Sequence, residues 1–266
     1  TLAGVVASVF AFTSLSTTAV VAQEAQTASA VVSPAKKTLA DVEYRLPSTI
    51  APTFQRIHLN IDPDNPTYSG KTNIDVTVKT PTKKVGFYQQ DLTVTSARLV
   101  SGSSSFPLNV TIGEYDINWG ESQDEIAPGK YTLEITFEGK VNTSSDGMYL
   151  SRFEETNYIF TQFEDMHARK AFPSFDEPNF KIPYQMTISS PEHQEIVGNT
   201  PVEKVTVENG IKTVVFEKTK PMPTYLIAYT VGPFDSAEIS GLSVPGKIYV
   251  PKGYADKTKF VIKHIP

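Results

Sequence analysis

Gln162 and Glu164 are the two side chains whose types and spacing best fit a binding site in this sequence. Side chains alternate along an extended strand, so residues two positions apart point to the same face. A carboxylate beside a carboxamide oxygen can accept the hydrogen bonds that an ammonium group donates. The spacing therefore fits a cation-binding site, although a solvated strand edge shows the same pattern and is the commoner case.

Motifs of several enzyme classes are missing from the sequence. None of its four histidines, His58, His167, His193 and His264, begins an HExxH zinc motif. The sequence also contains no GxSxG, P-loop or GxGxxG motif. It has no cysteine, which excludes disulfides, thiolate metal sites and thiol nucleophiles within it. From the residues alone, the chain is predicted to be a β domain without a visible catalytic apparatus.

Composition indicates a globular protein that does not bind nucleic acid. Of its 266 residues, 39% are hydrophobic and 20% are charged, which is enough apolar material for a buried core. The formal net charge is −5, and the lysine pairs at 36–37 and 83–84 are isolated. Nucleic-acid binding requires clustered basic residues that displace counterions, so we exclude this function.

The N-terminal segment predicts an exported protein. Residues 1–22 carry no charged side chain, and small residues at 20–22 fit a signal-peptidase cleavage site. A membrane anchor is the alternative, but serine and threonine dilute the second half of the segment below what a span of about 20 apolar residues requires. We expect a periplasmic or extracellular protein that contacts the membrane only if residues 1–22 are not cleaved. Residues 23–43 are predicted to be a linker.

From residue 44 onward, hydrophobic side chains alternate with polar ones. The alternation is clearest at residues 55–61, 74–78 and 131–137, and further strands are predicted at 158–163, 182–189, 213–217 and 225–231. Turn residues separate these segments at short intervals, which predicts a mainly β fold: an antiparallel β-sandwich or open sheets. The one helical pattern covers residues 255–265, where Phe260, Val261 and Ile265 are predicted to share a face.

Residues 161–184, TQFEDMHARKAFPSFDEPNFKIPY, resemble the signature stretch of the aminopeptidase N family of zinc peptidases. The matching positions are Thr161, Gln162, Glu164, Ala168, Arg169, Phe172, Pro173, Phe175, Asp176, Glu177, Pro178 and Lys181. Shorter blocks follow the family order from Tyr44 to the end of the chain. The resemblance implies a saddle-like N-terminal β domain over residues 44–250 and, over residues 251–266, the start of a catalytic domain that the sequence otherwise lacks.

The resemblance also implies roles for individual residues. Glu164 matches the glutamate that binds the α-ammonium group of a peptide substrate, and Gln162 matches the neighbouring residue that lines the first side-chain pocket. The full-length enzyme is expected to hold zinc and to cleave peptides with a free N-terminus. This chain is expected to bind no zinc, to be inactive alone, and to pack on the missing catalytic domain.

The rest of the signature stretch is predicted to be structural. Arg169 and Asp176 are expected to pair and brace the loop, whose path the prolines restrict. Two other functions stay open: an exported β-sandwich module that binds sugars or proteins without catalysis, with Trp119 as its single tryptophan, and a family member whose zinc domain has decayed into a scaffold. An intact downstream HExxH motif would favour the enzyme over both.

Overall fold

The structure is a computed structural model that describes residues 44–265. The predicted signal segment, residues 1–22, and the predicted linker, residues 23–43, lie outside the described residues. The described chain is mainly β, as predicted, with several antiparallel sheets and a short α-helix near its C-terminal end.

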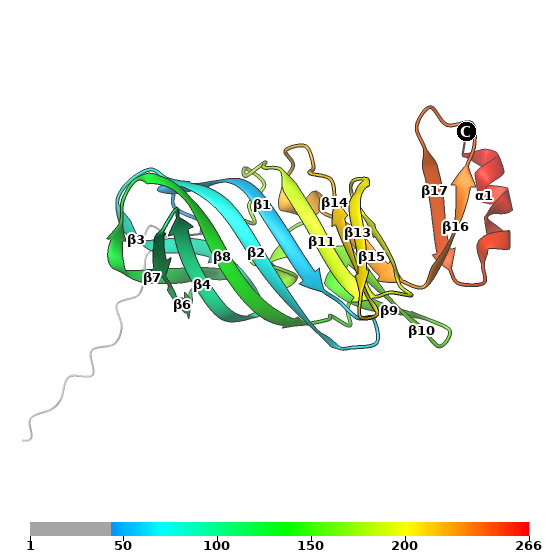
Figure 1. The fold of residues 1–266 in the computed structure, drawn as a ribbon, viewed down its shortest axis with the longest axis horizontal. Helices are drawn as coiled ribbons and strands as arrows, with labels where there is room; N and C mark the ends of the chain where they lie inside the picture. The colour runs from blue at the N-terminus through cyan, green and yellow to red at the C-terminus, as the bar shows by residue number, and fades with distance from the viewer. Residues whose placement is uncertain (1–43, 266) are drawn as a thin grey trace, which may run out of the picture. The chain divides into compact units, whose positions relative to one another are not determined.

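The largest sheet contains eight strands, which come from residues 50–216 (Figure 1). In spatial order, these strands are β13 (Val202–Glu208), β14 (Ile211–Phe216), β11 (Tyr184–Pro191), β1 (Ile50–Asn60), β2 (Thr67–Val78), β8 (Gly129–Lys140), β4 (Thr93–Ser101) and β5 (Ser104–Pro107).

Three smaller sheets complete the fold. The first contains β12 (Glu195–Gly198), β15 (Tyr229–Gly232), β10 (Thr156–Gln162) and β9 (Gly147–Phe153). The second contains β3 (Thr82–Tyr88), β7 (Ile117–Ile126) and β6 (Asn109–Ile112). The third is a hairpin of β16 (Phe234–Ile239) and β17 (Gly246–Pro251).

The eight-stranded sheet covers two separate hydrophobic cores. In one, Ile57 and Phe137 of this sheet pack with Ile159 and Val231 of the four-stranded sheet. In the other core, strands β2, β8 and β4 pack against the three-stranded sheet, so that residues such as Leu133 and Phe87 are buried together. The four-stranded and three-stranded sheets therefore cover different parts of the large sheet, and the layers form a sandwich at both places.

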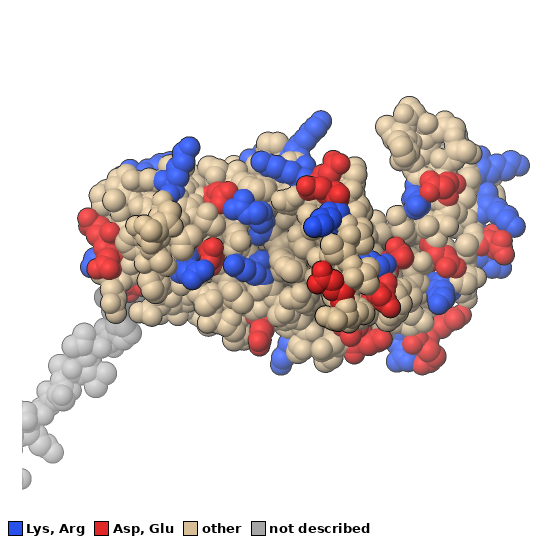
Figure 2. All heavy atoms as spheres, in the orientation of Figure 1, with Lys and Arg blue, Asp and Glu red and all other residues tan. Residues whose placement is uncertain are grey.

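Strand β8 shows why the sequence pattern predicted these layers. Leu133, Ile135 and Phe137 are fully buried, whereas Glu134 and Thr136 lie on the opposite face. Because successive side chains of a strand point to opposite faces, this alternation builds one apolar and one polar face. Acidic and basic side chains are interspersed over the molecular face in Figure 2, where they form no continuous basic stripe.

One pair of strands departs from the antiparallel arrangement that prevails in these sheets. Strands β1 and β11 pair in parallel, with Gln55 opposite Tyr184 and Asn60 opposite Ser189. Parallel neighbours need a crossover connection. Here the connection is long, because more than a hundred residues separate the two strands in the chain. The side-chain period of a strand is the same in either orientation, which is why alternation could not reveal this pairing.

Helical structure is limited to short segments: the 3₁₀ helices η2 (Ala168–Lys170), η3 (Thr224–Leu226) and η4 (Ala255–Thr258), and the α-helix α1 (Lys259–His264). The strand predicted at 225–231 is wrong in its first half, where η3 precedes β15. The helix predicted at 255–265 consists of η4 followed by α1. Phe260, Val261 and Ile265 are exposed rather than packed on the described residues. Within residues 44–265, every helix is too short to cross a membrane.

Candidate functional site

Strands β9 and β10 form a hairpin that ends at the predicted site. Gln162, the last residue of β10, lies opposite Gly147 at the start of β9. Gly147 has a φ of +67°, a left-handed conformation that glycine adopts without steric cost. A Cβ atom at this position would lie 3.1 Å from Cβ of Lys170. Glycine therefore allows the hairpin to pass close to the short helix η2.

Glu164 lies in the turn that follows β10. The strand ends at Gln162, so the prediction of one extended strand through both residues is wrong in its last two positions. Phe163 between them is buried, whereas Gln162 and Glu164 are both exposed. The Gln162 Oε1 atom accepts a hydrogen bond of 3.3 Å from the Glu164 backbone N–H. This bond ties the Gln162 side chain to the backbone of Glu164 on the exposed side of the loop.

Phe163 fixes the position of this loop. Its ring makes edge-to-face contacts with Phe172 and Tyr229, at centroid distances of 5.7 and 6.0 Å. Its carbonyl oxygen accepts a hydrogen bond of 2.9 Å from the backbone N–H of His167. A buried aromatic side chain between two exposed polar ones therefore holds the loop against the core.

Residues 168–178, which we call the brace, follow the loop and are mostly buried. The Arg169 Nε atom donates a hydrogen bond of 2.8 Å to Oδ2 of Asp176, and a terminal nitrogen of Arg169 donates to the Asp176 carbonyl oxygen at 2.9 Å. The hydroxyl of Thr224 donates to Oδ1 of the same carboxylate. The predicted pairing of Arg169 with Asp176 is confirmed, and it ties both ends of the brace together.

Glu177 adds a second buried connection that the sequence did not predict. Its Oε1 atom accepts hydrogen bonds from the Tyr88 hydroxyl at 3.0 Å and from the Leu46 backbone N–H at 2.7 Å. The guanidinium carbon of Arg169 lies 4.1 Å from the centroid of the Tyr88 ring. Burial and then the Glu177 carboxylate raise the pKa of the Tyr88 hydroxyl, which therefore stays protonated and donates.

Asp146 forms a polar cluster beside Gly147. Its carboxylate is paired with the ammonium group of Lys170, accepts a hydrogen bond of 2.7 Å from the Ser144 hydroxyl, and lies 3.8 Å from the His167 ring. The bonds from Lys170 and then from Ser144 hold the pKa of Asp146 below its usual value. The cluster links the loop before β9 to helix η2, and no local sequence signal indicated it.

A pocket of about 300 Å³ lies against the brace. Tyr44, Tyr115 and Met166 contribute to its wall, together with the paired Arg169 and Asp176. Met166 belongs to the turn that carries Glu164, but neither Gln162 nor Glu164 lines the pocket. The pocket therefore adjoins the same turn without including the two residues predicted to bind substrate.

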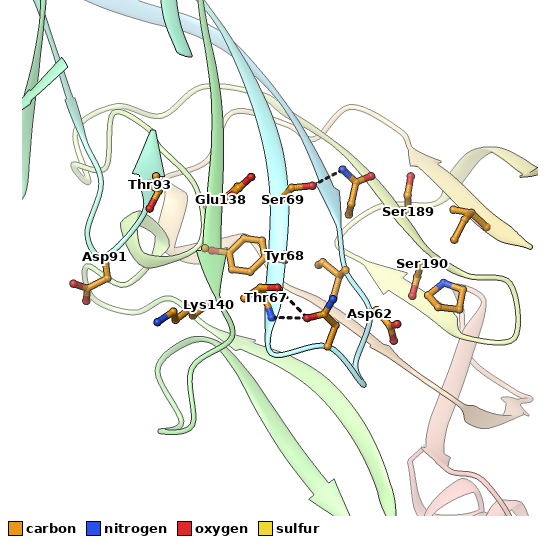
Figure 3. A pocket seen from close by; sticks show the side chains of 16 residues that line it. Asp62, Thr67, Tyr68, Ser69, Asp91, Thr93, Glu138, Lys140, Ser189 and Ser190 are labelled. Carbon is orange, nitrogen blue, oxygen red and sulfur yellow. Dashed lines mark hydrogen bonds between the residues drawn. The ribbon is translucent and has the colours of Figure 1, made fainter. Parts of the chain in front are cut away.

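A larger pocket of about 880 Å³ lies elsewhere, where the ends of several strands of the eight-stranded sheet meet (Figure 3). Asp62, Asp91 and Glu138 are its acidic residues and Lys140 is its basic one. Some of the residues that line it form hydrogen bonds with one another. For example, the Asn60 amide donates to the Ser69 hydroxyl at 3.0 Å. Gln162 and Glu164 are not among the residues that line it.

The described residues do not fit a zinc site. Within residues 44–265, there is no group of three or more His, Asp or Glu side chains that could hold a metal ion. His58 and His193 bond to the neighbouring side chains of Ser189 and Gln194, at 2.9 Å in each case. Burial lowers the pKa of His58.

The amino-acid sequence matches a known protein family. The profile of the peptidase M1 N-terminal domain matches residues 51–226, which include β10, the loop with Glu164 and the brace.

Three relatives illustrate the similarity. The chain is 30% identical over 227 residues to aminopeptidase N of Acetobacter pasteurianus, covering 82% of this chain and 62% of the relative. It is 33% identical over 226 residues to aminopeptidase M1-D of Oryza sativa subsp. japonica, covering 82% of this chain and 26% of the relative. With glutamyl aminopeptidase of Sus scrofa, 32% identity extends over 224 residues, 78% of this chain and 24% of the relative. The chain thus spans less than two thirds of the length of these relatives.

Proposed function

The chain belongs to the peptidase M1 family, whose N-terminal domain it contains, and we propose that this domain anchors the free N-terminus of peptides for a zinc aminopeptidase. The names of the relatives support an aminopeptidase as the whole protein. In this proposal, the zinc ion and the residues that activate water belong to the full-length enzyme and not to the residues of this chain. The protein is exported, and its first 22 residues are the signal peptide.

Glu164 is the proposed anchor. An aminopeptidase must measure one residue from the charged end of its substrate, and a fixed carboxylate converts that charge into a defined register. The observation that carries the proposal is the exposed pair at the end of β10, where the Gln162 amide oxygen lies within hydrogen-bonding distance of the Glu164 backbone. Gln162 is proposed to line the pocket for the first side chain.

The surroundings of Glu164 support binding of an external cation. Among residues 44–265, the basic side chains nearest in sequence are engaged elsewhere: Arg169 pairs with Asp176, and Lys170 pairs with Asp146. None of the salt bridges within residues 44–265 involves Glu164, so its carboxylate has no basic partner there. An incoming ammonium group would therefore not have to displace an existing ion pair.

The test is the substitution Glu164→Gln in the full-length enzyme. It keeps the size of the side chain and removes its charge. We expect KM for free-amine peptides to rise and kcat/KM to fall about 10²-fold, equivalent to about 2.7 kcal/mol of lost transition-state binding. The free energy of unfolding should stay within about 0.5 kcal/mol of the original, since the side chain is exposed. Steady-state kinetics and chemical denaturation measure the two quantities.

Asp165→Asn is the matched control, because it removes the same charge from the neighbouring exposed residue. It should leave KM nearly unchanged if Glu164 contacts the substrate. Equal losses in the two variants would show that the loop acts only through its general negative charge. Unchanged kinetics in Glu164→Gln would remove the anchor assignment.

A further inference from the structure

Strand β13 forms an edge of the eight-stranded sheet. It is the last strand in the order and pairs with β14 on one side, while its other side has no strand neighbour among residues 44–265. Val205 and Val207 of this strand are 51% and 52% exposed. An edge with free backbone groups and exposed apolar side chains can pair with a strand from another chain.

The register with β14 shows what each face of β13 carries. Val205 lies opposite Val214, which is buried in the core, so Val205 and Val207 continue the inner apolar face of the sheet. Lys204, Thr206 and Glu208 alternate with these valines and lie on the outer, polar face. The apolar face of the sheet thus continues to its edge, where it becomes exposed.

The turn after β13 determines which backbone groups are free. Asn209 and Gly210 form a two-residue loop with φ values of 52° and 77°, the geometry of a type I′ hairpin turn. Such a turn makes the flanking residues, Glu208 and Ile211, a hydrogen-bonded pair. Backbone groups alternate in direction along a strand, so Val205 and Val207 direct their N–H and C=O groups away from β14.

We propose that β13 pairs antiparallel with β13 of a second copy of this chain, about a two-fold axis through Thr206. In this register Val205 lies opposite Val207 of the second copy, and the outward backbone groups of these residues meet. Lys204 lies opposite Glu208 of the second copy on the other face. The two-fold axis repeats each contact, so the pairing contains two Lys–Glu pairs and two Val–Val pairs.

Charge complementarity selects this occupant and this register. A two-fold axis through Val205 would also align the outward backbone groups, but it would place Glu203 opposite Val207. The Glu203 carboxylate of each copy would then face no opposite charge. Opposite charges in facing positions of antiparallel strands stabilise the pairing, and like charges destabilise it. The register shift in β13 between Val202 and Lys204 limits regular pairing to residues 204–208. The dimer is therefore a weak, concentration-dependent one.

Charge reversal tests the register in the full-length protein by sedimentation velocity. Lys204→Glu places Glu opposite Glu twice, and Glu208→Lys places Lys opposite Lys twice. Each variant alone should weaken dimerisation at least about tenfold. An equimolar mixture of the two variants should regain the original dimerisation, because every pair across the axis is again Lys with Glu. Circular dichroism checks that both variants fold.

Lys79→Glu is the control, since it reverses an exposed charge just beyond strand β2. It should dimerise like the original protein. The proposal is overturned if the original protein stays monomeric at concentrations up to about 1 mM. It is also overturned if Lys204→Glu and Glu208→Lys dimerise normally when alone, or if their mixture shows no recovery.

Discussion

Two neighbouring regions of the signature stretch behave in opposite ways. The loop with Gln162 and Glu164 is exposed, and the Glu164 backbone N–H donates a long hydrogen bond of 3.3 Å to the Gln162 side chain. The brace, residues 168–178, is mostly buried and bonds through Arg169, Asp176 and Glu177 to distant parts of the chain. Residues that are adjacent in sequence thus have different physical tasks.

The difference teaches how a recognition residue can be both exposed and fixed. An exposed side chain loses rotamer freedom when it binds, and this entropy opposes binding. The buried ring of Phe163 and the ion pair of the brace hold the backbone on both sides of the loop, so that less freedom remains to be lost. Disrupting the brace should therefore reduce stability, whereas changing the loop should affect substrate binding.

The largest effect is expected from Asp176→Ala. This change removes the buried carboxylate partner of the Arg169 guanidinium, leaves only the more exposed Asp116 at 3.4 Å, and removes the acceptor of the Thr224 hydroxyl. The free energy of unfolding should fall by about 3–5 kcal/mol, the usual cost of breaking a buried ion pair by removing one partner. Chemical denaturation of the chain measures this change.

Glu134→Ala is the matched comparison, because it removes a carboxylate from the more exposed pair with Arg98. Its cost should be about 0–1 kcal/mol. A similar loss in both variants would mean that burial does not distinguish the brace from the surface of the sheet.

Tyr88→Phe should have an intermediate effect. It removes the hydroxyl that donates to Glu177 but keeps the ring against which Arg169 packs. A hydrogen bond to a charged group contributes about 1.5–3 kcal/mol, and we expect the free energy of unfolding to fall near the lower end because Glu177 keeps the Leu46 N–H. Thermal or chemical unfolding checks this value. A loss as large as that of Asp176→Ala would show that Glu177, rather than the ion pair, dominates the brace.

Gln162→Ala should have the smallest effect on stability. The side chain is exposed and its hydrogen bond is long, so the free energy of unfolding should change by less than about 0.5 kcal/mol. The same change should alter KM for peptides that differ in their first side chain, as measured with a substrate series. A loss of more than about 1 kcal/mol in stability would place Gln162 with the brace and erase the contrast between the two regions.

The sequence predicted part of the site well. The spacing of Gln162 and Glu164 predicted two side chains on one face of a strand; both are exposed beside the buried Phe163, although the strand ends at Gln162. The opposite charges of Arg169 and Asp176, seven residues apart, were enough to predict their pairing. Both predictions concern residues close in the chain, where the local backbone restricts which side chains can meet.

Contacts between distant segments were not predictable from the same patterns. Tyr88 reaches Glu177 across 89 residues, and Lys170 reaches Asp146 across 24. Strand β3 was also missed, since its residues 85–88 are all buried and show no alternation. A two-residue period requires one solvated face, so it cannot identify a strand segment that is covered on both faces.

The sequence alone determined the class of the fold and the exposed and buried sides of its most regular strands, because hydrophobic burial acts on each strand through its own two-residue period. Tertiary structure alone decided that β1 pairs in parallel with β11, and that Tyr88 and Glu177 meet although 89 residues separate them in the chain. The period records which face of a strand is buried but carries no information on which strand lies beside it, since that choice depends on packing among all the layers at once.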